Sequence, residues 1–177
     1  MKRLHLFELE DQAWFPSVIR DAGTAYLRYM GEITGHAALL VPTLEEMLRT
    51  TKSNWIVDLC SGGGGPIPLA LRELQIRGLK VRATLTDQYP NCEIFRHLAE
   101  ESNGAIDFSE EPVDVSHVPK ELRGSRTLFN SLHHFQPERA REILRDAARN
   151  EIPIGVFELV GRQPFMIFGV LFSWVAA

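Results

Sequence analysis

The chain has 177 residues, of which 45% are hydrophobic and 24% are charged, and its net charge at pH 7 is −4. This length and composition indicate a single globular domain with a sizeable core, and they exclude collagen-like, coiled-coil and broadly disordered chains. The negative charge, with only scattered arginines at 139–149 as a basic region, argues against nucleic acid as the main partner.

The two cysteines and the two ends of the chain bear on its location. Cys60 and Cys92 have no metal-ligand spacing, so we expect reduced thiols in a cytoplasmic protein and no metal site. The start, MKRLHLFELEDQ, lacks the apolar core of a signal peptide. Residues 165–177 are apolar and uncharged, but a bilayer-spanning helix needs about 20 residues. We expect a buried or interfacial segment there, with membrane contact in a longer form of the protein.

Two helices are expected before any strand. Apolar residues from Phe15 to Met30, including Val18, Tyr26 and Tyr29, recur with helical spacing and predict a helix whose apolar side faces a core. A second helix is expected over residues 42–50, where Thr43 and Glu46 have the spacing of a capping box. Together they would form an N-terminal helical cap over residues 1–53.

Strand and helix signals alternate through the rest of the chain. The expected strands are residues 55–59, 80–86, 105–109, 126–132 and 153–160, and the expected helices between them are residues 67–74, 91–102 and 137–150. Such alternation predicts parallel strands joined by right-handed crossovers, and therefore a doubly wound, mostly parallel α/β fold. We expect residues 54–160 to form a ligand-binding core and residues 161–177 an apolar extension of the same domain.

The most informative stretch is NWIVDLCSGGGGPIPLALREL at residues 54–74, in which four glycines separate the first strand from a helix. Ligands of open parallel sheets bind at the carboxyl ends of strands, and glycine lets a ligand lie against bare main chain beside a helix N-terminus. A phosphate-binding P-loop would need a lysine, and the dinucleotide pattern G-x-G-x-x-G fails because Ile67 or Pro68 occupies its last position. What remains is an acid followed by glycines, Asp58-Leu59-Cys60-Ser61-Gly62-Gly63-Gly64.

This acid and its glycines resemble the first motif of the class I S-adenosylmethionine-dependent methyltransferases, commonly D/E-x-G-x-G-x-G, with Cys60 in place of the first glycine. In LTDQYP, the resemblance implies that Asp87 accepts hydrogen bonds from both ribose hydroxyls, a task that suits an acceptor-only carboxylate. EEPVDVSHVP resembles the third motif, which implies Asp114 near the adenine amino group and Val115 beside the ring.

LFNSLHHFQP resembles the fourth motif of the family, which implies that Asn130 and Ser131 lie near the methionine moiety of the cofactor. His133 and His134 are weak candidates for a general base, and pocket lining is the preferred interpretation, so the catalytic residues stay unassigned. The whole implied cofactor-binding set is Asp58, Cys60, Ser61, Gly62, Gly64, Asp87, Gln88, Asp114, Val115, Asn130 and Ser131.

The resemblance implies a Rossmann-like fold, S-adenosylmethionine as cofactor, S-adenosylhomocysteine as product, and methyl transfer to a small or lipophilic acceptor. In the family the sheet usually ends with a further helix and two strands, and too few residues follow Val160 to build them, so we expect a shortened sheet. Two alternatives stay open. One is a non-catalytic module that binds the cofactor, and the other is an NAD-dependent oxidoreductase with an irregular loop.

Single residues also have structural interpretations. Asp87 could cap the helix that begins in PNCEIF, and Glu110 and Glu111 offer carboxylates that compete with Asp114. Tyr26, Tyr29 and Met30 are expected in the core of the first helix. The arginines at 139, 141, 145 and 149 are expected on a solvated helix face.

Overall fold

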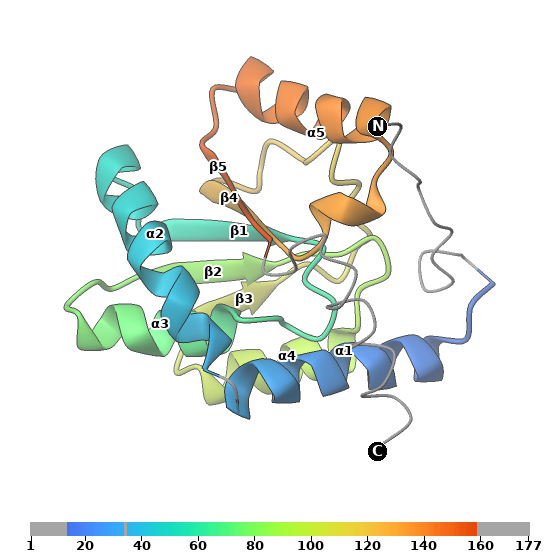
Figure 1. The fold of residues 1–177 in the computed structure, drawn as a ribbon, viewed down its shortest axis with the longest axis horizontal. Helices are drawn as coiled ribbons and strands as arrows, with labels where there is room; N and C mark the ends of the chain where they lie inside the picture. The colour runs from blue at the N-terminus through green and yellow to red at the C-terminus, as the bar shows by residue number, and fades with distance from the viewer. Residues whose placement is uncertain (1–13, 34, 159–177) are drawn as a thin grey trace, which may run out of the picture.

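The computed structural model describes residues 14–33 and 35–158, which form a five-stranded parallel sheet with helices on both faces (Figure 1). The strand order is β3-β2-β1-β4-β5. This arrangement confirms the predicted doubly wound parallel α/β fold. The elements in chain order are α1 (Ser17–Ile33), α2 (His36–Thr51), β1 (Trp55–Leu59), α3 (Ile67–Ile76), β2 (Arg82–Leu85), α4 (Cys92–Glu101), β3 (Ile106–Phe108), β4 (Ser125–Phe129), the 3-10 turn η2 (Leu132–His134), α5 (Pro137–Arg149) and β5 (Ile154–Phe157).

The core lies in two layers, one on each face of the sheet. Successive side chains of β1 point to opposite faces, so Ile56 packs with α2, α3 and α4, whereas Val57 and Leu59 pack with Ile143 of α5. The segment between β3 and β4 adds Val113 and other valines to the α5 layer. Figure 1 shows α5 on one side of the sheet and α2, α3 and α4 on the other. Because both faces of the sheet are covered, the central strands β1 and β4 are buried along almost their whole length.

The order of the strands fixes where a ligand can bind. The chain builds β1, β2 and β3 outward in one direction and then returns to add β4 and β5 on the other side of β1. The direction reverses between β1 and β4, whose residues Asp58 and Thr127 are in register. In open α/β sheets the ligand crevice lies outside the carboxyl ends of the strands at this point. The glycine loop after β1 lies at this edge.

The helix α2 begins earlier than the sequence predicts. It starts at His36 after Gly35, whose φ of 68° is left-handed, so the expected capping box at Thr43 and Glu46 is wrong and Pro42 lies inside the helix. Proline removes a backbone donor there. The apolar residues on both sides of it explain the outcome, because Leu40, Val41, Leu44 and Leu48 are all buried against the sheet.

The expected fourth strand is also shorter in the structure. It ends at Phe129, because Asn130 has a left-handed φ of 49° that turns the chain out of the sheet. Ser131 and Leu132 therefore lie in the turn that leads into α5. The last strand ends at Phe157, and the expected continuation to residue 160 reaches beyond the described residues, as do the apolar segment at 161–177 and the first 13 residues.

The helix α1 does not bury the apolar side that the sequence predicts. Val18 is 77% exposed and Tyr29 is 58% exposed, so the expectation of a core position for Tyr29 is wrong. The reason is its place in the fold, since α1 packs beside α2 and contacts the glycine loop and Tyr89 at the sheet edge. Among the described residues, no helix combines the length and the apolar character needed to cross a bilayer.

Candidate functional site at the carboxyl ends of the strands

The glycine loop is built from left-handed backbone. Cys60, Gly62, Gly64 and Gly65 have φ values of 60°, 53°, 92° and 49°. Only glycine adopts this region at little cost, so Cys60 is the strained position of the loop. The loop is tied to the sheet because the Ser61 N–H donates to the Thr86 carbonyl at 2.9 Å.

The bare backbone of this loop admits two neighbouring helices. A Cβ at Gly62 would lie 3.1 Å from the Cγ2 of Thr24 in α1, and a Cβ at Gly63 would lie 3.2 Å from the Oγ1 of Thr24. A Cβ at Gly64 would collide with the side chain of Leu98 in α4. The run of glycines therefore lets α1 and α4 approach the loop closely, with a tight contact to α1 at Gly62 and Gly63 and no space for a side chain beside α4 at Gly64.

Asp58, at the carboxyl end of β1, holds the loop from inside. It is 2% exposed, and its two oxygens accept hydrogen bonds from the hydroxyls of Ser61 at 2.7 Å and Thr127 at 2.7 Å. Burial raises the pKa of Asp58 to about 7, although both hydrogen bonds act in the opposite direction. In the structure this carboxyl joins β1, β4 and the glycine loop, and a contact with a cofactor stays a prediction.

Asp87 joins the second strand end to the same loop. Its Oδ2 accepts a hydrogen bond from the N–H of Gly62 at 2.8 Å, and its Oδ1 accepts one from the N–H of Tyr89 at 2.9 Å. Burial raises the pKa of Asp87, while these two hydrogen bonds and the charge of Arg20 oppose the rise. The bond to Gly62 places the carboxylate beside the glycine loop, as a ribose-binding acid would require. The bond to Tyr89 lies within a turn before α4, whose cap is Asn91 and not Asp87.

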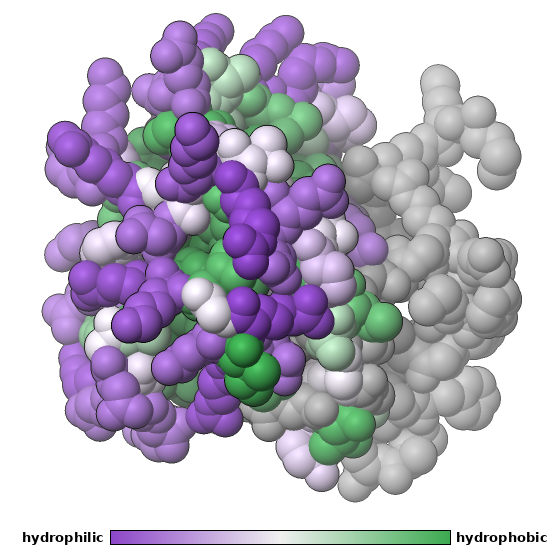
Figure 2. Space-filling view, turned by 90° about the vertical axis from the view of Figure 1, so that its left-hand side faces the viewer, coloured by the Kyte–Doolittle hydropathy of each residue, from purple (hydrophilic) through white to green (hydrophobic). Residues whose placement is uncertain are grey.

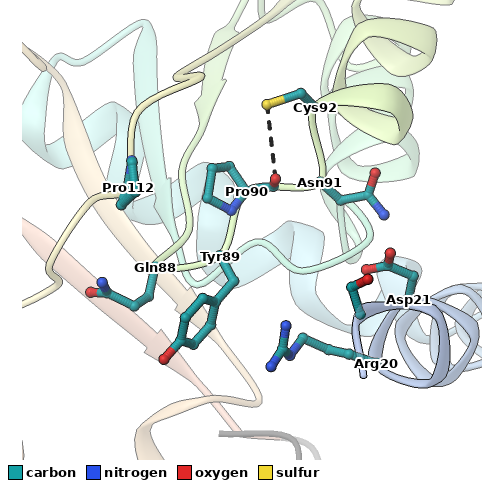
Figure 3. Close-up of a pocket in the computed structure, with 9 residues that line it drawn as sticks. Arg20, Asp21, Gln88, Tyr89, Pro90, Asn91, Cys92 and Pro112 are labelled. Carbon is teal, nitrogen blue, oxygen red and sulfur yellow. Dashed lines mark hydrogen bonds between the residues drawn. The ribbon is translucent and has the colours of Figure 1, made fainter. Parts of the chain in front are cut away.

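A pocket of about 340 Å³ opens beside this carboxylate, between α1 and the loop that follows β2 (Figure 3). Gln88, Tyr89 and Pro112 line one side and Arg20 of α1 lines the other, with its guanidinium 4.5 Å from the centre of the Tyr89 ring. Gln88, one of the expected cofactor-binding residues, thus lines a cavity, and its contact with a cofactor stays a prediction. Arg20 was not predicted, because nothing in the sequence brings α1 to this loop.

The third predicted motif is held by an arginine of α5. The Nη2 of Arg139 donates to both oxygens of Asp114 at 2.7 and 2.8 Å, and Ser116 donates its N–H and its hydroxyl to Oδ1. Burial acts to raise the pKa of Asp114, but these hydrogen bonds outweigh it and hold the pKa below its ordinary value. Arg139 is therefore an ion-pair partner and not simply part of a solvated face. Val115 is buried in the α5 layer of the core.

This third motif is nevertheless joined to the second. The N–H of Val113 donates to the carbonyl of Asp87 at 2.8 Å, so the two loops lie side by side at the sheet edge. Glu110, one of the competing carboxylates, instead pairs with Arg96 at 3.0 Å on the surface.

The fourth motif presents a buried hydroxyl. Asn130 is anchored because its N–H donates to the carbonyl of Phe157 at 2.8 Å. Ser131 is 8% exposed, and within the described part of the chain its Oγ has no hydrogen-bond partner. Buried hydroxyls are almost always paired, so an unpaired one at a strand end indicates a place for an external partner.

His133 forms a pair that the sequence did not predict. Its Nδ1 lies 2.7 Å from the Oε2 of Glu158, and the Oε1 of Glu158 accepts the N–H of Leu132 at 2.9 Å. The carboxylate therefore fixes both the imidazole and the turn that carries it. The ring of His134 lies beside it at a tilt of 44°, with ring centres 4.4 Å apart. The available signal for Glu158 was an acid near the carboxyl end of the fifth expected strand, since Asp58 and Asp87 also lie near strand ends.

The structure thus gathers the predicted residues at one edge but joins them in separate pairs. Gly62 is bonded to Asp87, Asp58 to Ser61, Asp114 to Arg139, and His133 to Glu158. Across residues 14–33 and 35–158, no group of three or more His, Cys, Asp or Glu side chains is arranged to hold a metal ion. Both cysteines are free thiols.

Comparison with known proteins gives similarity in structure alone. No protein-family model matches the sequence, and no curated protein matches it. Among solved structures, LaPhzM is 22% identical with a TM-score of 0.56, over 83% of this chain and 42% of that one. Human N-acetylserotonin methyltransferase, solved in complex with SAM, is 15% identical with a TM-score of 0.55, over 76% of this chain and 35% of that one. An O-methyltransferase family protein from Burkholderia thailandensis is 20% identical with a TM-score of 0.51, over 73% and 37%.

These similarities establish the fold. The chain has the Rossmann-like fold that S-adenosylmethionine-dependent methyltransferases have, built on a parallel sheet with helices on both faces. The chain spans about two fifths of the length of these solved structures.

Proposed function

We propose that this chain is the cofactor-binding core of an S-adenosylmethionine-dependent methyltransferase. The observation that carries the proposal is the hydrogen bond between the Asp87 carboxylate and the Gly62 N–H. It brings an acceptor-only group from the end of β2 to the glycine loop after β1, at the point where ligands bind in this fold. The fold shared with solved methyltransferases supports the same cofactor class.

The residues present fit this cofactor. Asp87 would accept the ribose hydroxyls, and Gln88 lines the adjoining pocket. The unpaired hydroxyl of Ser131 suits the polar methionine end, because a ligand group would give it the partner that the described residues do not. Asp114 fits the adenine amino group if it shares its oxygens with Arg139.

The chemistry follows from what each side would supply. The bound cofactor would provide a methyl group already activated by a positively charged sulfur. The chain would hold the acceptor in line with that methyl and keep water out. A hydroxyl acceptor would also have to lose its proton, and His133, whose Nδ1 lies 2.7 Å from the Glu158 carboxylate, is the candidate base.

A non-catalytic cofactor-binding module is the second candidate. The observation in its favour is that Asp114, one of the implied cofactor contacts, is already engaged by Arg139. The two candidates differ in one result, since only a methyltransferase would convert a labelled methyl donor into a methylated product with an acceptor hydroxyl. Substitution of His133 by Ala would abolish that turnover while S-adenosylhomocysteine affinity stays within about twofold, which a module without catalysis does not predict.

Calorimetric titration with S-adenosylhomocysteine tests the cofactor. We expect saturable binding by the wild type, binding at least about tenfold weaker in Asp87→Asn, and no response to NAD. Asp107→Asn is the matched control. Asp107 is an exposed acid on the neighbouring strand β3, and its side chain accepts a hydrogen bond from the N–H of the next residue, Phe108. Binding that is unaffected by Asp87→Asn, or a response to NAD alone, would contradict the proposal. A response to NAD alone would favour the oxidoreductase interpretation.

We further propose a small or lipophilic acceptor, a cytoplasmic location, and membrane contact through residues 161–177 in a longer form. These residues lie outside the described part of the chain. Flotation of the protein with lipid vesicles, compared with a variant shortened before residue 161, tests the membrane contact. Equal recovery of both with the vesicles would contradict it.

A further inference from the structure

A second pocket lies at the opposite edge of the sheet, where β4 and β5 begin. Its volume is about 360 Å³, and it is bounded by the segment before β4, the C-terminal end of α5 and the turn into β5. The lining residues are Lys120, Arg126, Arg149, Asn150, Glu151 and Ile152. Figure 2 looks onto the side of the molecule that carries the amino ends of the strands, and hydrophilic side chains cover most of it.

One wall of this pocket is a buried arginine. Arg126 in β4 is 1% exposed, and its Nη1 donates to the Oδ2 of Asp146 at 2.6 Å. Among the described residues, Asp146 is the one hydrogen-bonding partner of the Arg126 guanidinium, and its Nε has none. The other oxygen of Asp146 accepts from the side-chain amide of Asn150 at 3.2 Å, so this carboxylate is shared. A guanidinium has several N–H donors in a fixed plane. The buried guanidinium of Arg126, with a single acceptor oxygen, therefore has fewer hydrogen-bond acceptors than donors.

The rim adds further positive charge. Lys120 and Arg149 are exposed and line the pocket, and neither forms an ion pair with any residue that the structure describes. Glu151 is the one carboxylate among the lining residues, beside three cations. This concentration of positive charge stands out in a chain whose net charge is −4. A cavity with cations on its rim and an undersupplied arginine in its wall selects an anion.

We propose that this pocket binds a phosphate group, as the free ion or as the phosphomonoester of a small molecule. A tetrahedral dianion presents oxygens in several directions, so it can accept from Arg126 and pair with Lys120 and Arg149 at the same time. A planar carboxylate has one charge and two oxygens for the same three cations. The volume leaves space beyond a phosphate for the rest of a small ligand.

This site is separate from the proposed cofactor site. Arg126 in the pocket wall is near the start of β4, and Ser131 follows five positions later beyond the other end of the strand, which is about 17 Å at 3.3 Å per residue. Binding of phosphate here therefore does not depend on methyl transfer, and either proposal can fail without the other.

Thermal unfolding of the full chain at constant ionic strength tests the site. We expect inorganic phosphate and glycerol phosphate to raise the midpoint temperature in a saturable way, whereas chloride does not. Lys120→Gln and Arg149→Gln should each weaken the apparent affinity at least about fivefold. Arg145→Gln is the matched control, because this arginine of α5 is exposed but does not line the pocket. Phosphorus NMR line broadening gives an independent readout of binding.

The outcomes separate cleanly. A stronger response to glycerol phosphate identifies a phosphorylated small molecule as the ligand, and an equal response identifies the free ion. No stabilisation beyond that of chloride would overturn the proposal. So would a phosphate response of the same size in Lys120→Gln, Arg149→Gln and wild type. Lys120→Gln and Arg149→Gln change exposed side chains, so loss of folding does not confound the comparison. Arg126→Met tests the buried arginine in the same assay if that variant unfolds in a single transition.

Discussion

The free energy of unfolding should fall as the pH rises from 5 to 8, and Asp58 should cause most of the change. Burial raises its pKa from 3.8 to about 7 in the folded chain, so the folded state holds a proton that the unfolded state has already released. The stability that Asp58 contributes is fully present below pH 3.8 and is lost as the pH rises through about 7. Proton linkage between these two pKa values gives a loss of about 2–3 kcal/mol in the free energy of unfolding between pH 5 and pH 8.

Urea unfolding followed by circular dichroism at a series of pH values measures this effect. Asp58→Asn removes the titrating group while it keeps a side chain that can hydrogen-bond with Ser61 and Thr127. The variant should show a stability that changes by less than about 1 kcal/mol over the same range, with the remainder due to Asp87, whose raised pKa acts in the same direction. Asp114 acts in the opposite direction because its pKa is lowered. If wild type and Asp58→Asn lose stability in parallel, the reasoning is refuted.

Three further substitutions test other parts of the structure. Cys60→Gly should raise the free energy of unfolding by about 1 kcal/mol, because it removes a side chain from left-handed backbone; a lower melting temperature would contradict this. Gly64→Ala should cost about 2–4 kcal/mol in urea unfolding, since it adds a collision with α4 to the strain of a positive φ, whereas Gly104→Ala, with open space around it, should cost about 1 kcal/mol. Asp146→Asn should destabilise the chain by about 3 kcal/mol in the same assay by leaving the buried guanidinium of Arg126 without its carboxylate; a change below about 1 kcal/mol would show that the pair is dispensable.

Much of the fold was predictable because local patterns and tertiary packing agree. The apolar run at 55–59 and the helical spacing from Ile67 to Leu74 each match one element of the structure, and the residues predicted to face the core are buried. The alternation of such elements is sufficient to predict parallel strands. The predictions failed where packing overrides a local signal. Pro42 marks a helix start in the sequence, yet the apolar residues before it extend α2 back to His36.

The candidate site was predictable in part for a similar reason. Acids and glycines that end strands are visible in the sequence, and the sheet necessarily brings strand ends together, as the bond between Asp87 and Gly62 confirms. Partners contributed by helices are not visible in this way. Arg139 lies in α5, 25 positions after Asp114, and its contact with Asp114 depends on how α5 packs on the sheet. Thr24 is a further example, since no periodicity shows that α1 will lie on the glycine loop.

The contact between Thr24 and the glycine loop restricts how the sequence can change. A side chain at Gly63 would need Thr24 to move, because its Cβ would lie 3.2 Å from the Oγ1 and 3.3 Å from the backbone carbonyl carbon of that residue. The carbonyl carbon is present whatever residue occupies position 24, so no substitution there removes the whole contact. Homologous sequences should therefore keep glycine at position 63, because of a helix residue 39 positions away in the chain.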